Sequence, residues 1–142
     1  MARIKGRDTK PEMVLRRALH ALGFRYRLHV RGLPGRPDLV FPRYHAAVFV
    51  HGCFWHGHDC ELFRIPATRP DFWKEKIAGN RARDTVTLDS LRTLGWRTLV
   101  VWECAMRGKH RRSVDVIADT IAEWLRSDAT PGEIRGELPC LS

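Results

Sequence analysis

The chain has 142 residues, of which 44% are hydrophobic, and it contains no apolar run of the roughly 20 residues that a membrane-spanning helix needs. Lysine and arginine number 25 against 16 acidic residues, so the net charge of +9 favours nucleic acid as a partner over a merely solubilising basic surface. Four cysteines without a secretion signal indicate a metal site or reduced thiols, and we expect one cytoplasmic domain.

Three regions are expected along the chain. Residues 1–8 form a basic arm, residues 9–126 form the folded domain, and residues 127–142 form a flexible tail that contains Cys140. The basic side chains of the arm, which we expect to contact DNA phosphates, are Arg3, Lys5 and Arg7. The order helix, three strands, helices, strand and helix predicts an α/β domain with a central mixed β-sheet flanked by helices.

The first helix is predicted from a capping box. Thr9 is the expected N-cap with Glu12 three residues later, and apolar residues at helical spacing follow as far as Gly23. Arg16 and Arg17 are expected on its solvent face. Capping alone explains Glu12, yet a carboxylate at this position can also turn towards a metal, and it therefore stays a secondary site candidate.

Three strands follow the first helix. They are expected at residues 24–30, 39–41 and 46–50, the last two forming a hairpin. Antiparallel pairing would bring Asp38 beside the carbonyl of Val50 and the imidazole of His51. A carboxylate there is either a turn-capping aspartate or a ligand for Mg2+, which prefers oxygen donors.

The loop that follows, residues 51–60, holds three of the seven histidines and two of the four cysteines. Cys53, His58 and Cys60 form a C-x4-H-x-C arrangement, and Cys104 lies just past a predicted strand that could deliver a fourth ligand. Thiolates and imidazoles in a set of four are typical of a structural zinc site. The alternatives are ordinary buried thiols or a disulfide.

Two histidines of this loop, His51 and His56, are left without a structural role. Phosphodiester hydrolysis needs a divalent metal, a base near a water and a donor near the leaving oxygen, which Asp38 and two imidazoles can supply with Mg2+. The alternative is that both are satisfied core histidines. Phe54, Trp55 and Trp73 are either core aromatics or rings that enter the base stack of mismatched DNA.

Two further helices, a strand and a last helix complete the chain. The helices are expected at residues 70–78 and from about 80 to 94, the strand from Trp96 or Arg97 to Trp102, and the last helix after Ser113 as its N-cap.

Motifs spread over the chain resemble the very short patch repair (Vsr) endonucleases. They are residues 34–38 (PGRPD), 51–56 (HGCFWH) with His58 and Cys60, 66–69 (PATR), 72–73 (FW), 76–77 (KI), 94–97 (LGWR) and 101–104 (VWEC). The resemblance covers residues 3–126 and implies a restriction-endonuclease-like fold. It also implies an enzyme that nicks one DNA strand 5′ to the thymine of a T:G mismatch, the product of 5-methylcytosine deamination.

The resemblance implies roles for single residues. It implies Mg2+ bound by Asp38 and the main-chain carbonyl of Val50, catalytic histidines at His51 and His56 with His56 as general base, and a supporting acid at Glu12. It implies structural Zn2+ on Cys53, His58, Cys60 and Cys104, and DNA intercalation by Phe54, Trp55, Trp73 and Met1. The implied partners are mismatched duplex DNA, mismatch-repair proteins and a cognate cytosine methyltransferase, and we expect a monomer.

Two departures from the family pattern stand out. Family members usually carry threonine where this chain has Val50, so a carbonyl ligand survives but a hydroxyl contact is lost. The family also has a longer basic segment before the position of Met1. A different class of function, a non-catalytic zinc-stabilised module that binds distorted DNA, remains the alternative, while the absence of an H-E-x-x-H helix disfavours a zinc hydrolase of another substrate.

Overall fold

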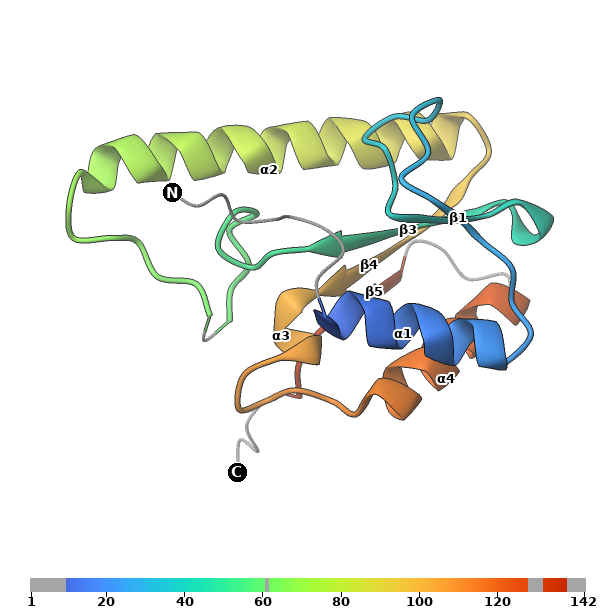
Figure 1. The fold of residues 1–142 in the computed structure, drawn as a ribbon. Coiled ribbons are helices and arrows are strands. Elements are labelled where there is room, and N and C mark those ends of the chain that lie inside the picture. Colours follow the sequence, from blue (N-terminus) through green and yellow to red (C-terminus); the bar gives the residue numbers. More distant parts are fainter. Residues whose placement is uncertain (1–9, 61, 128–131, 138–142) are drawn as a thin grey trace.

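A five-stranded mixed sheet forms the centre of the protein (Figure 1). The computed structural model describes residues 10–60, 62–127 and 132–137. The strands are β1 (Arg27–Leu28), β2 (Leu39–Phe41), β3 (Ala46–His51), β4 (Arg97–Trp102) and β5 (Gly132–Ile134), and they lie in this order across the sheet. β1, β2 and β3 pair antiparallel, whereas β3, β4 and β5 run parallel. The predicted mixed α/β sheet is confirmed.

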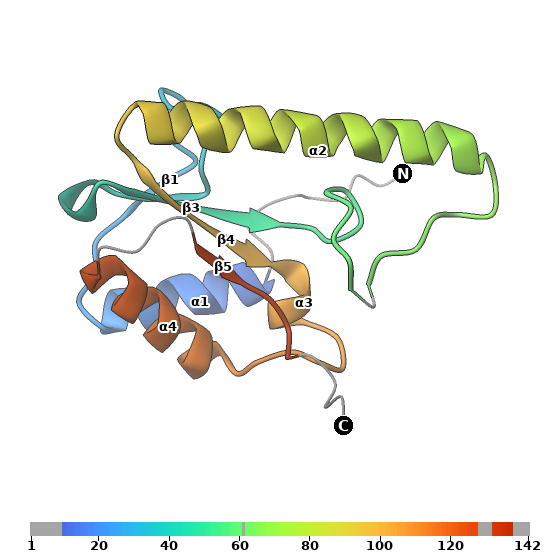
Figure 2. The same ribbon diagram turned by 180° about the vertical axis from the view of Figure 1, so that it is seen from behind.

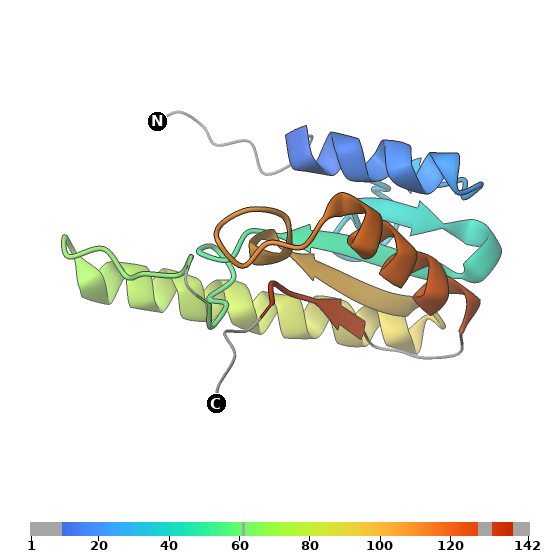
Figure 3. The ribbon, with the colours of Figure 1, turned by 90° about the horizontal axis from the view of Figure 1, so that it is seen from below.

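Helices cover both faces of the sheet. They are α1 (Lys10–Ala21), α2 (Pro70–Thr93), the short α3 (Glu103–Met106) and α4 (Val114–Arg126), with a 3-10 turn, η1 (Pro42–Tyr44), in the β2–β3 hairpin. α1 and α4 pack side by side on one face, as Figure 3 shows from below, and α2 lies alone on the other face (Figure 2). The first half of α2 projects past the strand ends, alongside the loop that follows β3 (Figure 1).

Alternation along β3 decides which side chains face α2. Ala46 and Val48 belong to the hydrophobic cluster under α1 and α4, whereas Ala47 and Phe49 belong to the cluster under α2. Because side chains two residues apart share a face of a sheet, His51 continues the row of Phe49 towards α2. The end of β3 therefore presents an imidazole to the helix.

The structure corrects several boundaries. Within the predicted strand at residues 24–30 only Arg27–Leu28 pair with β2, and the two helices predicted between residues 70 and 94 are the single helix α2. Gly79 separated them in the prediction, but an interior glycine costs a helix only about 1 kcal/mol. Gly132–Ile134, predicted as flexible tail, pair with β4 as β5 because they lie beside an otherwise unpaired strand edge.

One of the two helix caps that the sequence predicted can be compared with the structure. The Ser113 side chain accepts a hydrogen bond from the Val116 N–H, so the N-cap of α4 is confirmed. Thr9 lies outside the described residues. Arg16, predicted on the solvent face of α1, is 8% exposed, which makes that expectation wrong. Among the described residues no helix has the length and apolar character to span a bilayer.

Candidate active site and metal centre

The β2–β3 hairpin fixes Asp38 beside Val50. Leu39 pairs with Val48, so Asp38 lies one step before β2 and opposite the end of β3. The contact differs from the expected one, because the Val50 N–H, not its carbonyl, meets Asp38 and donates to Oδ2 at 2.7 Å. Val50 and Asp38 nevertheless line the same cavity.

Next to this pair lie the two predicted histidines and one carboxylate, Asp84, that the sequence reasoning missed. The rings of His51 and His56 are stacked, with centroids 3.8 Å apart and planes 3° apart. His56 Nδ1 lies 2.5 Å from Asp84 Oδ2 on α2. Since a carboxylate can only accept, Nδ1 carries the proton of this hydrogen bond, which leaves the lone pair of a neutral His56 on Nε2.

The loop after β3 is held close to α2 near the contact between His56 and Asp84. The Asn80 side chain donates to the carbonyl of Trp55 at 2.9 Å. Gly57 has a φ of +61°, and a Cβ at this position would lie 2.7 Å from Ile77 Cγ2. A side chain there would force the loop away from the helix, so Gly57 permits the close approach.

These groups surround a cavity of about 200 Å3. Its lining includes Asp38, Val50, His51, His56 and Asp84. The cavity brings together the predicted aspartate, the two predicted histidines and Val50 in one space.

Burial sets the protonation of two of these groups. Burial raises the pKa of Asp38 to about 6, an effect increased by the nearby Glu12 carboxylate and opposed by the Val50 N–H, His29 and Arg16. A carboxylate kept from water beside a second negative charge suits a divalent cation. Burial and the neighbouring His56 lower the pKa of His51 to about 3, so its imidazole is neutral at physiological pH.

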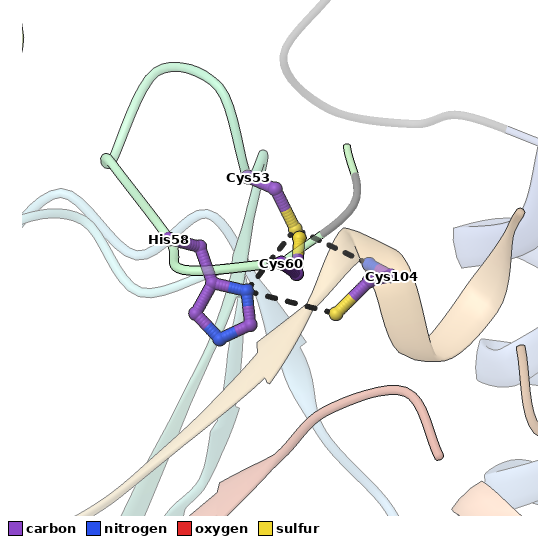
Figure 4. A group of neighbouring side chains, drawn as sticks. All are labelled: Cys53, His58, Cys60 and Cys104. Carbon is purple, nitrogen blue, oxygen red and sulfur yellow. Dashed lines mark hydrogen bonds between the residues drawn. The ribbon is translucent and has the colours of Figure 1, made fainter. Parts of the chain in front are cut away.

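The second cluster lies on the other side of the same loop. Cys53, His58 and Cys60 come from the loop, and Cys104 comes from the start of α3 (Figure 4). Cys53 and Cys104 each follow the last residue of a strand by two positions, and because β3 and β4 are parallel neighbours these positions meet at one edge.

The geometry of this cluster fits a tetrahedral metal. All four ligand atoms lie within 4.8 Å of one another, and His58 Nδ1 is 3.5 Å from Cys53 Sγ and 3.6 Å from Cys104 Sγ. A zinc–sulfur bond of about 2.3 Å places tetrahedral ligands roughly 3.7 Å apart. The three cysteines are free thiols, so a disulfide is excluded among them. Cys3His sets are typical of structural zinc sites.

Hydrogen bonds from the surrounding backbone stabilise the cluster. The Cys104 N–H donates to Cys53 Sγ and the Gly136 N–H to Cys104 Sγ, each at 3.3 Å. Arg135 bonds both the side chain and the main-chain carbonyl of Asp59, at 3.0 and 3.1 Å. The residues just after β5, predicted as tail, thus line the Cys3His cluster.

A cluster of aromatic rings joins the loop after β3 to the start of α2. Phe54 contacts Trp55 and Trp73 edge to face, with ring centroids 5.0 and 5.5 Å apart. Phe72, which the sequence reasoning did not single out, packs against Trp73 and is 43% exposed. The three rings expected to enter DNA therefore lie together. The other expected DNA contacts lie outside the described residues: Met1, Arg3, Lys5 and Arg7.

Asp84 carried a signal that the sequence reasoning overlooked. It lies seven residues after Ile77 and seven before Leu91, the two buried residues of α2. Positions seven apart share one face of a helix. A carboxylate on an apolar face needs a partner, and an unpaired histidine in the loop is the natural one.

Comparison with known proteins gives consistent matches. The family model described as "DNA mismatch endonuclease Vsr" matches residues 1–62. The DNA mismatch endonuclease Vsr of Escherichia coli K12 is 42% identical over 134 residues, which are 94% of this chain and 86% of that protein. The type II nicking enzyme V.XorIIP of Xanthomonas oryzae is 47% identical over 106 residues, 75% of this chain and 78% of its own. V.NmeAIP of Neisseria meningitidis, also a type II nicking enzyme, is 43% identical over 109 residues, 77% of this chain and 78% of its own.

Proposed function

Because the chain belongs to the Vsr family of DNA mismatch endonucleases, we propose that it nicks one strand of a duplex 5′ to the thymine of a T:G mismatch. Membership makes it a phosphodiester hydrolase with DNA as partner, not a binding module alone. The finer proposal is a Mg2+-dependent reaction that starts very short patch repair of deaminated 5-methylcytosine. The main observation in support of this reaction is that Asp38, His51 and His56 line one cavity.

His56 is the proposed general base. Its Nδ1–H is held by Asp84 at 2.5 Å, which leaves Nε2 to accept a proton from the attacking water. Asp84 also stabilises the positive charge that His56 gains when it takes that proton. His51, neutral and stacked on His56, would act through hydrogen bonding and not as a cation.

Asp38 and the main-chain carbonyl of Val50 are the proposed ligands of the cation. A bound Mg2+ would offset the negative charge that builds on the phosphoryl oxygens. The buried Asp38 carboxylate, with Glu12 close enough to raise its pKa, is the observation that supports this assignment. Val50 in place of threonine leaves the carbonyl unchanged.

The exposed rings and the basic face of α2 support a distorted duplex as the substrate. Trp55 is 37% and Phe72 is 43% exposed, so both are available to stack on bases. The projecting half of α2 carries exposed cations at Lys74, Lys76, Arg81 and Arg83. Unstacking costs least where pairing is already defective, which favours mismatched sites.

The test of the proposed function is a nick-mapping assay. The protein and Mg2+ are incubated with end-labelled duplexes that carry each mismatch in varied flanking sequences, and the cut position is read on a denaturing gel. We expect a nick 5′ to the thymine of T:G, no cut in fully paired DNA, and no cut without a divalent cation. Equal cleavage of paired and T:G duplexes would contradict the proposal.

Replacement of Asp84 tests the proposed base. In Asp84→Asn the amide can donate to His56 Nδ1, which moves the ring proton to Nε2 and removes the lone pair that would accept from water. We expect kcat to fall about 10²–10⁴-fold with mismatch binding unchanged, measured in single-turnover nicking and gel-shift experiments.

Asp89→Asn is the matched control, because Asp89 lies on the exposed side of the same helix. Its activity should equal that of the parent protein. Full activity of Asp84→Asn would show that the tautomer of His56 does not matter for nicking.

A further inference from the structure

A partly buried chain of polar groups leads from α1 to Asp38. Arg16, 8% exposed, lies with Nη2 3.5 Å from Glu12 Oε2 and 3.4 Å from His29 Nε2. On the other side of the same ring, His29 Nδ1 is 3.7 Å from Asp38 Oδ1. Of these four residues, the sequence indicated only Glu12 and Asp38 as site candidates.

The chemistry of arginine fixes the tautomer of His29. A guanidinium has only donors, so His29 Nε2 must be the acceptor in the contact with Arg16. The ring proton then sits on Nδ1, the nitrogen that faces Asp38 Oδ1. Arg16 can therefore donate to Nε2, while the N–H at Nδ1 faces the Asp38 carboxylate at 3.7 Å, which is an electrostatic contact longer than a hydrogen bond.

The backbone of His29 is strained. His29 has a φ of +46°, in the left-handed region that residues other than glycine rarely adopt. Its N–H donates to the carbonyl of Asp38 at 3.1 Å. Strained backbone of this kind persists where the surroundings over-determine it, often at functional sites. His29 is therefore joined to Asp38 through both its main chain and its ring.

We propose that His29 is a positioning residue for Asp38, with its tautomer set by Arg16, and that this relay orients the carboxylate for the catalytic cation. Asp38 Oδ2 accepts from the Val50 N–H, and the His29 ring faces Oδ1, so the two contacts restrict rotation of the carboxylate. Groups that orient a metal-binding side chain typically change metal affinity or activity 10–100-fold when removed. The inference rests on the proposed role of Asp38 in binding that cation.

The experiment compares two replacements of His29. His29→Gln keeps an acceptor for Arg16 and a donor for Asp38, whereas His29→Met fills similar space with neither. For each variant, nicking of a T:G duplex is titrated with Mg2+, and mismatch binding and thermal unfolding are measured without divalent cation. We expect about a tenfold or greater rise in half-saturating Mg2+ for His29→Met, about threefold or less for His29→Gln, and parental mismatch binding in both.

A matched control comes from the far end of β3. His45 has a similar left-handed backbone, with φ +52°, but stacks on Trp96 at a centroid distance of 4.1 Å, away from the cavity. His45→Met should leave the Mg2+ titration unchanged. Independently of activity, ¹⁵N-detected NMR of the imidazoles should find the proton of His29 on Nδ1.

Each other outcome has a definite meaning. Parental half-saturating Mg2+ in His29→Met, equal effects of the two replacements, or a proton on Nε2 would overturn the relay. If His29→Met behaves as the parent while Asp38→Asn is inactive, only the relay fails. If Asp38→Asn itself nicks with unchanged Mg2+ dependence, the proposed function fails at this site, and the relay fails with it because Asp38 would no longer bind the cation.

Discussion

Replacing Asp38 by asparagine is expected to reduce nicking on the order of 10³-fold while mismatch binding persists. Asparagine keeps the size of the side chain and an oxygen that can accept from the Val50 N–H, so the hairpin contact at 2.7 Å survives. The negative charge is lost. A divalent cation contributes several kcal/mol to stabilising the transition state, and each 1.4 kcal/mol corresponds to a factor of ten in rate.

The measurement is a single-turnover nicking rate at saturating protein, beside a gel shift without divalent cation. Asp38→Ala gives a less clear result, because it removes the acceptor of the partly buried Val50 N–H and so also lowers stability. Asp119→Asn, on the exposed side of α4, is the control for loss of one negative charge. Nicking at the parental rate by both Asp38→Asn and His56→Ala would remove the proposed mechanism.

The sequence predicted that Asp38, Val50 and His51 lie together because they are close along the chain. A short hairpin connects Asp38 to Val50, and period-two alternation gives the face of each side chain. The meeting of Cys104 with the loop could also be predicted, because Cys104 directly follows an apolar strand. Local sequence patterns were therefore sufficient to predict the positions of side chains at the ends of strands.

What could not be predicted depends on the packing of helices against the sheet. Asp84 reaches His56 only because α2 lies across the face to which His51 points. Arg16 is buried because it shares a helix face with the buried Glu12 and Leu19, at spacings of four and three residues. Arg16 was predicted to face solvent from its charge alone, whereas its position on the apolar face of the helix indicated burial.

The C-terminal region shows the same limit. Gly132–Ile134 are too short and too near glycine and proline for a strand signal, and they become β5 only through pairing with β4. The segment after them then contributes the Gly136 N–H to Cys104 Sγ. Tertiary context decides the structure of such short segments, since a strand gains its hydrogen bonds only from a neighbour.

Loss of one cysteine ligand is expected to release the bound metal and to destabilise the whole domain. Cys104→Ser replaces a buried thiol, 3% exposed, by a hydroxyl that zinc binds poorly. Metal binding at structural zinc sites contributes about 10–16 kcal/mol in small zinc domains, comparable with the roughly 5–15 kcal/mol of a typical folded domain. We therefore expect purified Cys104→Ser to lack stoichiometric zinc and to unfold at a markedly lower temperature than the parent.

Burial of the thiols is expected to make metal binding depend on pH. It raises the pKa of the Cys53 and Cys104 thiols, so the cation must displace protons from both, and its apparent affinity falls as the pH is lowered. Elemental analysis and thermal unfolding of Cys104→Ser are compared with Cys140→Ser, which replaces a cysteine that is not one of the four proposed ligands and should retain both metal and stability. A parent protein that is free of zinc, or a Cys104→Ser variant with parental stability, would contradict a structural metal. The same loop carries Cys53 and His56, so release of the metal should also abolish nicking. Excess Mg2+ should not restore this activity.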